Sequence, residues 1–126
     1  METIKTRTAI ISLIKENFVK MTMLEDAILD LNDMIENHNA EIKITNQKKH
    51  VILIDTRLNS MSSDDARKFS SGDEPLKYRL AVAILFKGLA SRITANSLIK
   101  NYNPKVLTQI FNDEHKAIEW LESFLK

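Results

Sequence analysis

The sequence predicts an α/β fold, with a four- to five-stranded, mostly parallel or mixed sheet covered by four helices. Two apolar runs, at 51–54 and 80–86, are continuous rather than alternating, as in strands buried on both faces of a sheet. Segments with helical apolar spacing alternate with these runs, and such alternation favours right-handed crossovers onto a parallel sheet. Because the 126 residues contain no linker, residues 1–126 are expected to form a single domain.

The N-terminal residues 3–23 are rich in Ile, Val, Thr, Phe and Met, which favour strands. Residues 1–21 are therefore expected to form a strand or a hairpin. Two interpretations of Lys15-Glu16-Asn17 stay open: a turn between two short strands, or part of one bent strand.

The first helix is predicted to begin at Thr22, because Thr22 and Glu25 have the spacing of a capping box. Its opposite face is acidic, and it is expected to be solvated or, as the alternative, to dock on a basic partner. The sequence Asn37-His38-Asn39 is expected to end it. The apolar stripe of this helix consists of Leu24, Ala27, Ile28, Leu31, Met34 and Ile35.

A second, short helix is predicted to open at the Ser-Ser-Asp-Asp sequence of 62–65. Ser62 and Asp65 match a capping signature there. The Gly-Asp-Glu-Pro sequence at 72–75 is expected to break this helix.

The last third of the sequence predicts two helices and a strand. A third helix is expected over 91–102, and Asn103-Pro104 is expected to stop it. A strand over 106–111 follows. Asn112 or Asp113 is expected to cap the fourth helix.

Composition excludes several classes of function. A formal net charge of +1, from 18 basic and 17 acidic residues, gives little support for nucleic-acid binding. With no cysteine and only two glycines, a thiolate metal site, a cysteine nucleophile and a glycine-rich phosphate loop are excluded. The three histidines lie far apart, so neither a metal nor a cofactor is expected. No apolar run reaches the roughly 18 residues of a transmembrane helix, and a cytoplasmic location without membrane insertion is expected.

Several different short motifs lie along the chain. They are a strand ending in Ile-Asp, then Asp-Ala-Arg, Ala-Val-Ala-Ile-Leu, Ser-Arg with a later Asn, Phe-Asn-Asp-Glu and Ala-Ile-Glu-Trp-Leu. They lie at 51–55, 65–67, 81–85, 91–92, 96, 111–114 and 117–121. As a set they resemble STAS domains, the family of SpoIIAA-type anti-sigma factor antagonists. The likeness is closer to small uncharacterised bacterial proteins with a SpoIIAA-like fold. It spans about residues 22–125, and residues 1–21 match it poorly.

The resemblance implies a regulatory protein–protein interaction module rather than an enzyme. In SpoIIAA-type proteins a partner kinase phosphorylates the second serine of an Asp-Ser-Ser-Gly motif at the start of the second helix, which blocks the complex. An alignment without gaps places Asp64 at that position, where no phosphate can be attached, whereas a shift of one residue places Ser63 there. Ser63 and Ser62 are therefore the candidate phosphoacceptors. The alternative is that the serine only caps the helix.

The expected surface for an unidentified protein partner or a ligand lies around 60–68 and extends to the third helix. Its residues are Asp55, Arg57, Ser62, Ser63, Asp64, Arg67, Arg92 and Asn96. Asp55 ends a buried strand, where open α/β sheets place ligand-facing residues, or it forms a structural ion pair with Arg57 or Arg67. Arg92 belongs to a basic stretch that contains no acidic residue. Two interpretations of this stretch stay open: it is a site that attracts an anion, or it is only a solvated surface.

The alternative function is a small-ligand-binding domain that holds an anionic or lipid-like molecule between the sheet and the third helix. No nucleophile–base motif supports an enzyme. Exposed edge strands could also pair two copies into a homodimer. Four methionines are expected to fill the core rather than form a binding surface. They are Met21, Met23, Met34 and Met61.

Overall fold

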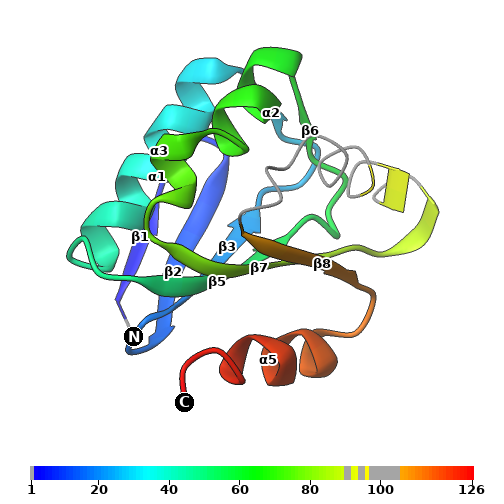
Figure 1. Ribbon diagram of the computed structural model, residues 1–126. Coiled ribbons are helices and arrows are strands. Elements are labelled where there is room, and N and C mark those ends of the chain that lie inside the picture. The colour runs from blue at the N-terminus through cyan, green and yellow to red at the C-terminus, as the bar shows by residue number, and fades with distance from the viewer. Residues whose placement is uncertain (1, 90–91, 94–95, 97–105) are drawn as a thin grey trace.

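The computed structural model describes residues 2–89, 92–93, 96 and 106–126, and within these the α/β fold with its mixed sheet is confirmed (Figure 1). Six strands form the main sheet in the order β1-β2-β3-β5-β7-β8. Their bounds are Thr3–Lys5 (β1), Ala9–Lys15 (β2), Phe18–Met23 (β3), His50–Asp55 (β5), Arg79–Leu85 (β7) and Leu107–Phe111 (β8). Two further strands, Ile28–Leu29 (β4) and Met61–Ser62 (β6), pair separately.

The main sheet has an antiparallel half and a parallel half. The strands β1, β2 and β3 form an antiparallel meander, and β5, β7 and β8 continue from β3 in parallel. The continuous apolar runs form β5 and β7 at inner positions of the sheet, as their composition predicts. The N-terminal segment supplies three strands instead of one or two, which raises the strand count above the expected four to five.

The connection between β2 and β3 is a turn. Lys15 pairs with Phe18 across it, and Asn17 has a φ of 63°. Asparagine adopts this left-handed conformation more readily than most residues. The hairpin interpretation of Lys15-Glu16-Asn17 is therefore confirmed, and the bent strand is wrong.

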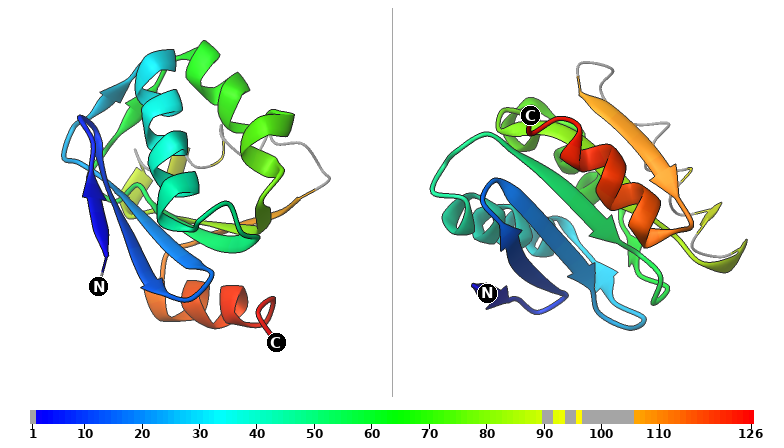
Figure 2. Two further views of the ribbon diagram at one scale, coloured as in Figure 1. Left: turned by 90° about the vertical axis from the view of Figure 1, so that its left-hand side faces the viewer. Right: turned by 90° about the horizontal axis from the view of Figure 1, so that it is seen from below.

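Helices cover the two faces of the sheet unequally (Figures 1 and 2). The helices α1 (Leu31–Ile44), α2 (Asp64–Ser70) and α3 (Asp73–Leu76) lie on one face, and α5 (Glu114–Glu122) lies on the other. On the α1 side the core contains Val19, Met21, Ile52, Ile54 and Val82. On the other side α5 buries Ala117 and Leu121 against β5 and β7. No described helix covers β1 and β2 on the α5 side, as the view from below shows (Figure 2).

The predicted start of the first helix is wrong. Thr22 lies in β3 and pairs with Asp55 of β5, so the Thr22–Glu25 capping box does not form. The helix begins at Leu31 instead. The Asp30 side chain accepts from the Asp33 N–H at 2.9 Å, and the Asp33 side chain accepts from the Asp30 N–H at 2.9 Å. The capping box therefore forms at Asp30 and Asp33, after β4, instead of at Thr22 and Glu25.

The first helix also runs beyond Asn37-His38-Asn39 to Ile44. Two of these polar residues are buried with partners, which removes the reason to expect a helix end. Asn37 donates to Thr8 Oγ1 at 3.0 Å. The ring of His38 packs edge-on against Phe69 at 5.6 Å between centroids.

The later boundaries lie close to the predicted ones. Ser63, not Ser62, caps α2 by accepting from the Ala66 N–H at 3.2 Å. The break at 72–75 is itself a short helix, α3. Asp113 caps α5 by accepting from Lys116. Most of the helix predicted over 91–102 lies outside the described residues.

Candidate functional site

The candidate site lies at the carboxyl-terminal ends of β3 and β5, where open α/β sheets place their ligands. Two loops leave the sheet there and contact each other through β4 and β6. The Asp26 N–H donates to the Leu58 carbonyl at 2.9 Å, and the Met61 N–H donates to the Ala27 carbonyl at 2.8 Å. These bonds hold the two short strands in parallel register, with Ile28 opposite Met61.

The outer side of this small sheet is apolar and exposed. Ile28 is 71% exposed and Met61 is 63% exposed, while the next residue of β4, Leu29, is buried in the core. Directly paired residues of neighbouring strands project to the same side. The side chains of Ile28 and Met61 therefore form one apolar patch, called here the β4–β6 surface. Leu58 adds a third exposed apolar side chain in the adjoining loop.

A methionine pocket opens beside this surface, with a volume of about 40 Å³. Its lining includes Met21 and Met23 of β3, Met34 of α1 and Met61 of β6, with serine and threonine hydroxyl groups from the surrounding segments. Met21 and Met23 are buried, as expected for core methionines. The expectation is wrong for Met61, which is exposed.

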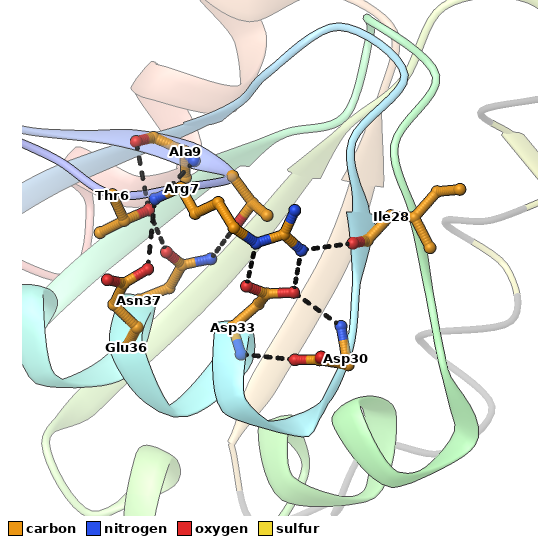
Figure 3. A network of polar contacts seen from close by, with 9 residues as sticks. Thr6, Arg7, Ala9, Ile28, Asp30, Asp33, Glu36 and Asn37 are labelled. Atoms are coloured by element: carbon orange, nitrogen blue, oxygen red, sulfur yellow. Dashed lines mark hydrogen bonds and ion pairs between the residues drawn. The ribbon is translucent and has the colours of Figure 1, made fainter.

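The charged network of Figure 3 fixes the position of β4. Arg7, in the turn between β1 and β2, forms a bidentate ion pair with Asp33 in the first turn of α1 and donates to the Ile28 carbonyl at 3.0 Å. The Glu36 carboxylate accepts from the Arg7 N–H at 3.2 Å. The hydrogen bond from Arg7, and the one from the Asp30 N–H, hold the pKa of Asp33 at about 2 against the effect of burial. Sequence analysis missed Arg7, because its partners are distant along the chain.

The start of α2 adjoins β6 and contains the predicted serines. Ser63 is exposed, and its hydroxyl already serves as the helix cap. Arg67 donates to the Ser62 carbonyl at 2.5 Å and forms an ion pair with Asp64. Since its guanidinium bonds there, the predicted alternative of an Asp55–Arg67 pair is wrong.

Asp55 forms the other predicted pair, with Arg57. Arg57 Nε and Nη2 donate to the two Asp55 oxygens at 3.0 and 2.8 Å. Glu114, the first residue of α5, accepts from Arg57 at 2.9 Å and from Lys20 at 2.9 Å. Burial raises the pKa of Asp55, but the hydrogen bonds and charge of Arg57 outweigh it and hold that pKa below its usual value. The network joins α5 to the ends of β3 and β5.

The structure describes Arg92 and Asn96 as exposed helical residues. The Arg92 guanidinium lies 6.0 Å from the centre of the Phe86 ring, beyond the end of β7. Among the described residues, no hydrogen bond or ion pair joins Arg92 or Asn96 to the start of α2. These two residues are therefore not brought into one polar cluster with Ser62 and Ser63.

A fully buried charged cluster lies at the opposite ends of the strands, where β5 and β7 begin. Glu41 of α1 accepts from Arg79 Nε and Nη2 at 2.9 and 2.7 Å, and its other contact is His50 Nε2 at 2.6 Å. Burial alone would raise the pKa of Glu41, but the charge and hydrogen bonds of Arg79, together with His50, hold it at about 2. Nothing of this carboxylate is exposed, and it lies at the opposite ends of the strands, so it takes no part in the candidate site.

The arrangement of sheet, crossover helices and α5 is a SpoIIAA-like fold. It is similar to the crystal structure of an uncharacterised protein of the DUF3478 family, from Shewanella loihica PV-4, which has a SpoIIAA-like fold. The TM-score is 0.60 at 17% identity, over 95% of this chain and 90% of that chain. The predicted SpoIIAA-like fold is thereby confirmed.

The chain belongs to the family described as "Domain of unknown function (DUF7793)", which matches residues 12–125. No curated protein matches the chain. In the part of the chain that the structure describes, no helix is long and apolar enough to cross a membrane. Within the same residues, no three His, Asp or Glu side chains converge in a way that could hold a metal ion.

Proposed function

We propose that this protein is a non-catalytic, STAS-like protein–protein interaction module whose partner binds the β4–β6 surface and the start of α2. The observation that carries the proposal is the exposed pair of Ile28 and Met61 in register on two short strands. Large apolar side chains that lie together on a surface are typical of protein contacts. The predicted residues Ser62, Ser63, Asp64 and Arg67 border this patch in the chain and complete the proposed contact.

At this surface, the volume of the methionine pocket favours a protein partner over a small ligand bound in the same pocket. Pockets that bind small molecules usually have volumes of about 300–1,000 Å³, whereas the methionine pocket measures about 40 Å³. It has room for the tip of one apolar side chain and is too small for a lipid chain. A partner that inserts one such side chain fits this size better.

The proposal is tested by site-specific photo-crosslinking from position 61 in the native cells, with mass spectrometry of what is captured. The control crosslinker stands at Ile14, which is 42% exposed at the far end of β2. The partner identified is then purified and titrated against the wild type, Ile28→Asp, Met61→Asp and the control Ile14→Asp. Hot-spot losses in interfaces predict an affinity about tenfold weaker for the two surface variants, with the control unchanged.

Equal capture from positions 61 and 14, or equal affinity of all variants, would contradict the proposed contact. A thermal melt of each variant accompanies the titration, because a loss of affinity counts only where folding is retained. Peptides of this chain, recovered from the same cells, also report whether Ser62 or Ser63 carries a phosphate. We propose that such a phosphate blocks the contact, because it would place about two negative charges beside the apolar patch.

A further inference from the structure

We infer that the partner presents a basic amphipathic helix, whose apolar face covers Ile28 and Met61 and inserts one side chain into the methionine pocket. The inference rests on the proposed function and adds the chemistry of the partner. Three observations support it: the charge around the surface, the composition of the pocket and the state of the backbone of β4 and β6.

The surface is bordered by negative charge. Four exposed carboxylates flank β4 and β6 along the chain, and they form the acidic rim: Glu25, Asp26, Asp30 and Asp65. None of the four forms an ion pair among the described residues. The arginines of the neighbouring segments are already bound, Arg7 to Asp33, Arg57 to Asp55 and Glu114, and Arg67 to Asp64. A partner with lysines or arginines beside its apolar side chains would therefore be attracted, and an acidic one repelled.

The pocket suits an apolar side chain of variable shape. Methionine is unbranched and polarizable, so a methionine lining adapts to different inserted groups, and surfaces of this type bind amphipathic helices. Met61 lines the pocket and is also exposed, so it stands at its mouth. Met34, which is half-buried, lies deeper on α1.

The backbone favours a helix over an added strand. A peptide strand needs a free sheet edge with several unpaired backbone groups. Each of β4 and β6 is only two residues long, and the Met61 and Ser63 N–H groups already donate to the Ala27 and Leu29 carbonyls. A helix needs no backbone groups from its receptor. The acidic rim also disfavours nucleic acid and anionic membranes, since both present phosphate.

The test uses three synthetic peptides of about 16 residues, long enough to form a helix on binding. One has leucines on one face and lysines on the other. The second replaces every lysine with glutamate, and the third replaces every leucine with serine. The protein is labelled with ¹³C at its methionine methyl groups, so that Met34 and Met61 report directly on the pocket. We expect only the Leu/Lys peptide to bind and to shift both of these signals.

The charge part of the inference has its own variant. Glu25→Gln combined with Asp65→Asn removes two rim charges, and we expect it to weaken binding of the Leu/Lys peptide about fivefold, from two exposed charge contacts. The matched control, Glu16→Gln combined with Glu119→Gln, removes two exposed charges elsewhere and should leave binding unchanged.

Three results would overturn the inference: equal binding of the glutamate peptide, retained binding of the serine peptide, or binding without movement of the Met34 and Met61 signals. These failures differ from a failure of the proposed function. If a captured partner depends on Met61 but binds through an acidic or extended segment, the contact surface stands and only the basic helix is wrong. If no partner depends on Met61, the proposed function itself fails.

Discussion

At the scale of single residues, Glu41 is a carboxylate that lies wholly inside the protein. It contacts Arg79 and His50 with no exposure to solvent. Replacing Glu41 with Gln removes the negative charge opposite a buried guanidinium. Breaking a buried ion pair in this way costs about 3–5 kcal/mol. We therefore expect Glu41→Gln to lower the free energy of unfolding by about that amount in urea denaturation.

An exposed ion pair supplies the control for this experiment. Lys15 and Glu122 join the end of β2 to α5 and are both partly exposed to water. Exposed pairs contribute about 0–1 kcal/mol, so Glu122→Gln should change stability little. A comparable loss in the two variants would show that Glu41 has no special role.

The sequence predicted single residues only where their role follows from local context. Asp55 could be singled out because it ends a buried strand, and its pairing with Arg57 needs only a short turn. Lys20 and Glu114 complete that network, yet they reach it from other elements, so no local pattern marks them. The same holds for Arg79 of β7, whose partner Glu41 lies on helix α1. Such pairs become visible only when the strand order is known.

At the scale of elements, the Asp30 capping box sets the start of α1. Asp30→Ala removes the side-chain acceptor for the Asp33 N–H, and loss of an N-cap costs about 1 kcal/mol. Thr22→Val removes the hydroxyl of the box that the sequence suggested but that does not form. We expect the first variant to be less stable than the wild type by about 1 kcal/mol and the second to change stability by less than about 0.5 kcal/mol. The reverse order of effects in chemical denaturation would place the helix start at Thr22 after all.

The displacement of this helix has a physical cause. Leu24 fits a helical stripe, but Met23 directly before it lies in β3, which buries Met23 in the core. The chain then turns at Asp26, with a φ of 54°, before β4 pairs with β6. A two-residue strand has too little sequence to show a period, so the β4–β6 surface could not be predicted from pattern alone. The apolar residues assigned to a helix stripe instead supply the exposed side chain of Ile28.

At the scale of the whole molecule, acid stability follows from the buried carboxylates. The pKa values of Glu41 and Asp33 are held at about 2, against ordinary values of 4.5 and 3.8. As the pH falls, these carboxylates therefore bind protons in the unfolded chain before they do so in the folded protein. The stabilisation that the two groups give is present above about pH 4.5 and is lost as the pH falls towards 2. Burial also lowers the pKa of His38, so its contribution begins to decline below pH 6.5.

We therefore expect the free energy of unfolding to decline gently below pH 6.5 and steeply between about pH 4.5 and 2. The Glu41→Gln variant should show a shallower slope over the lower range, because one of the responsible groups is absent. Urea titrations of both proteins at a series of pH values measure this. Identical slopes would contradict the assignment of acid sensitivity to Glu41.

The fold class was predictable because the strongest signals are the longest ones. Two continuous apolar runs and the helices between them define a parallel α/β core, and β5 and β7 stand where that pattern requires. The strand count was not predictable, since residues 3–23 contain three strands joined by turns without glycine. The turn between β2 and β3 uses Asn17 in its place. A turn without glycine or proline gives only a weak signal in a single sequence.

The order of strands in the main sheet follows their order along the chain, from β1 at one edge to β8 at the other. When each new strand leaves the ribosome, the strand with which it pairs has therefore already been synthesised. No strand has to enter between two that are already paired. Since domains begin to fold from their N-terminal parts during synthesis, the growing sheet can lengthen by one strand at a time, and α5 follows as the element that shields β5 and β7 from water. The nascent chain thus exposes that apolar face until α5 is made, which sets the interval in which a chaperone would be needed.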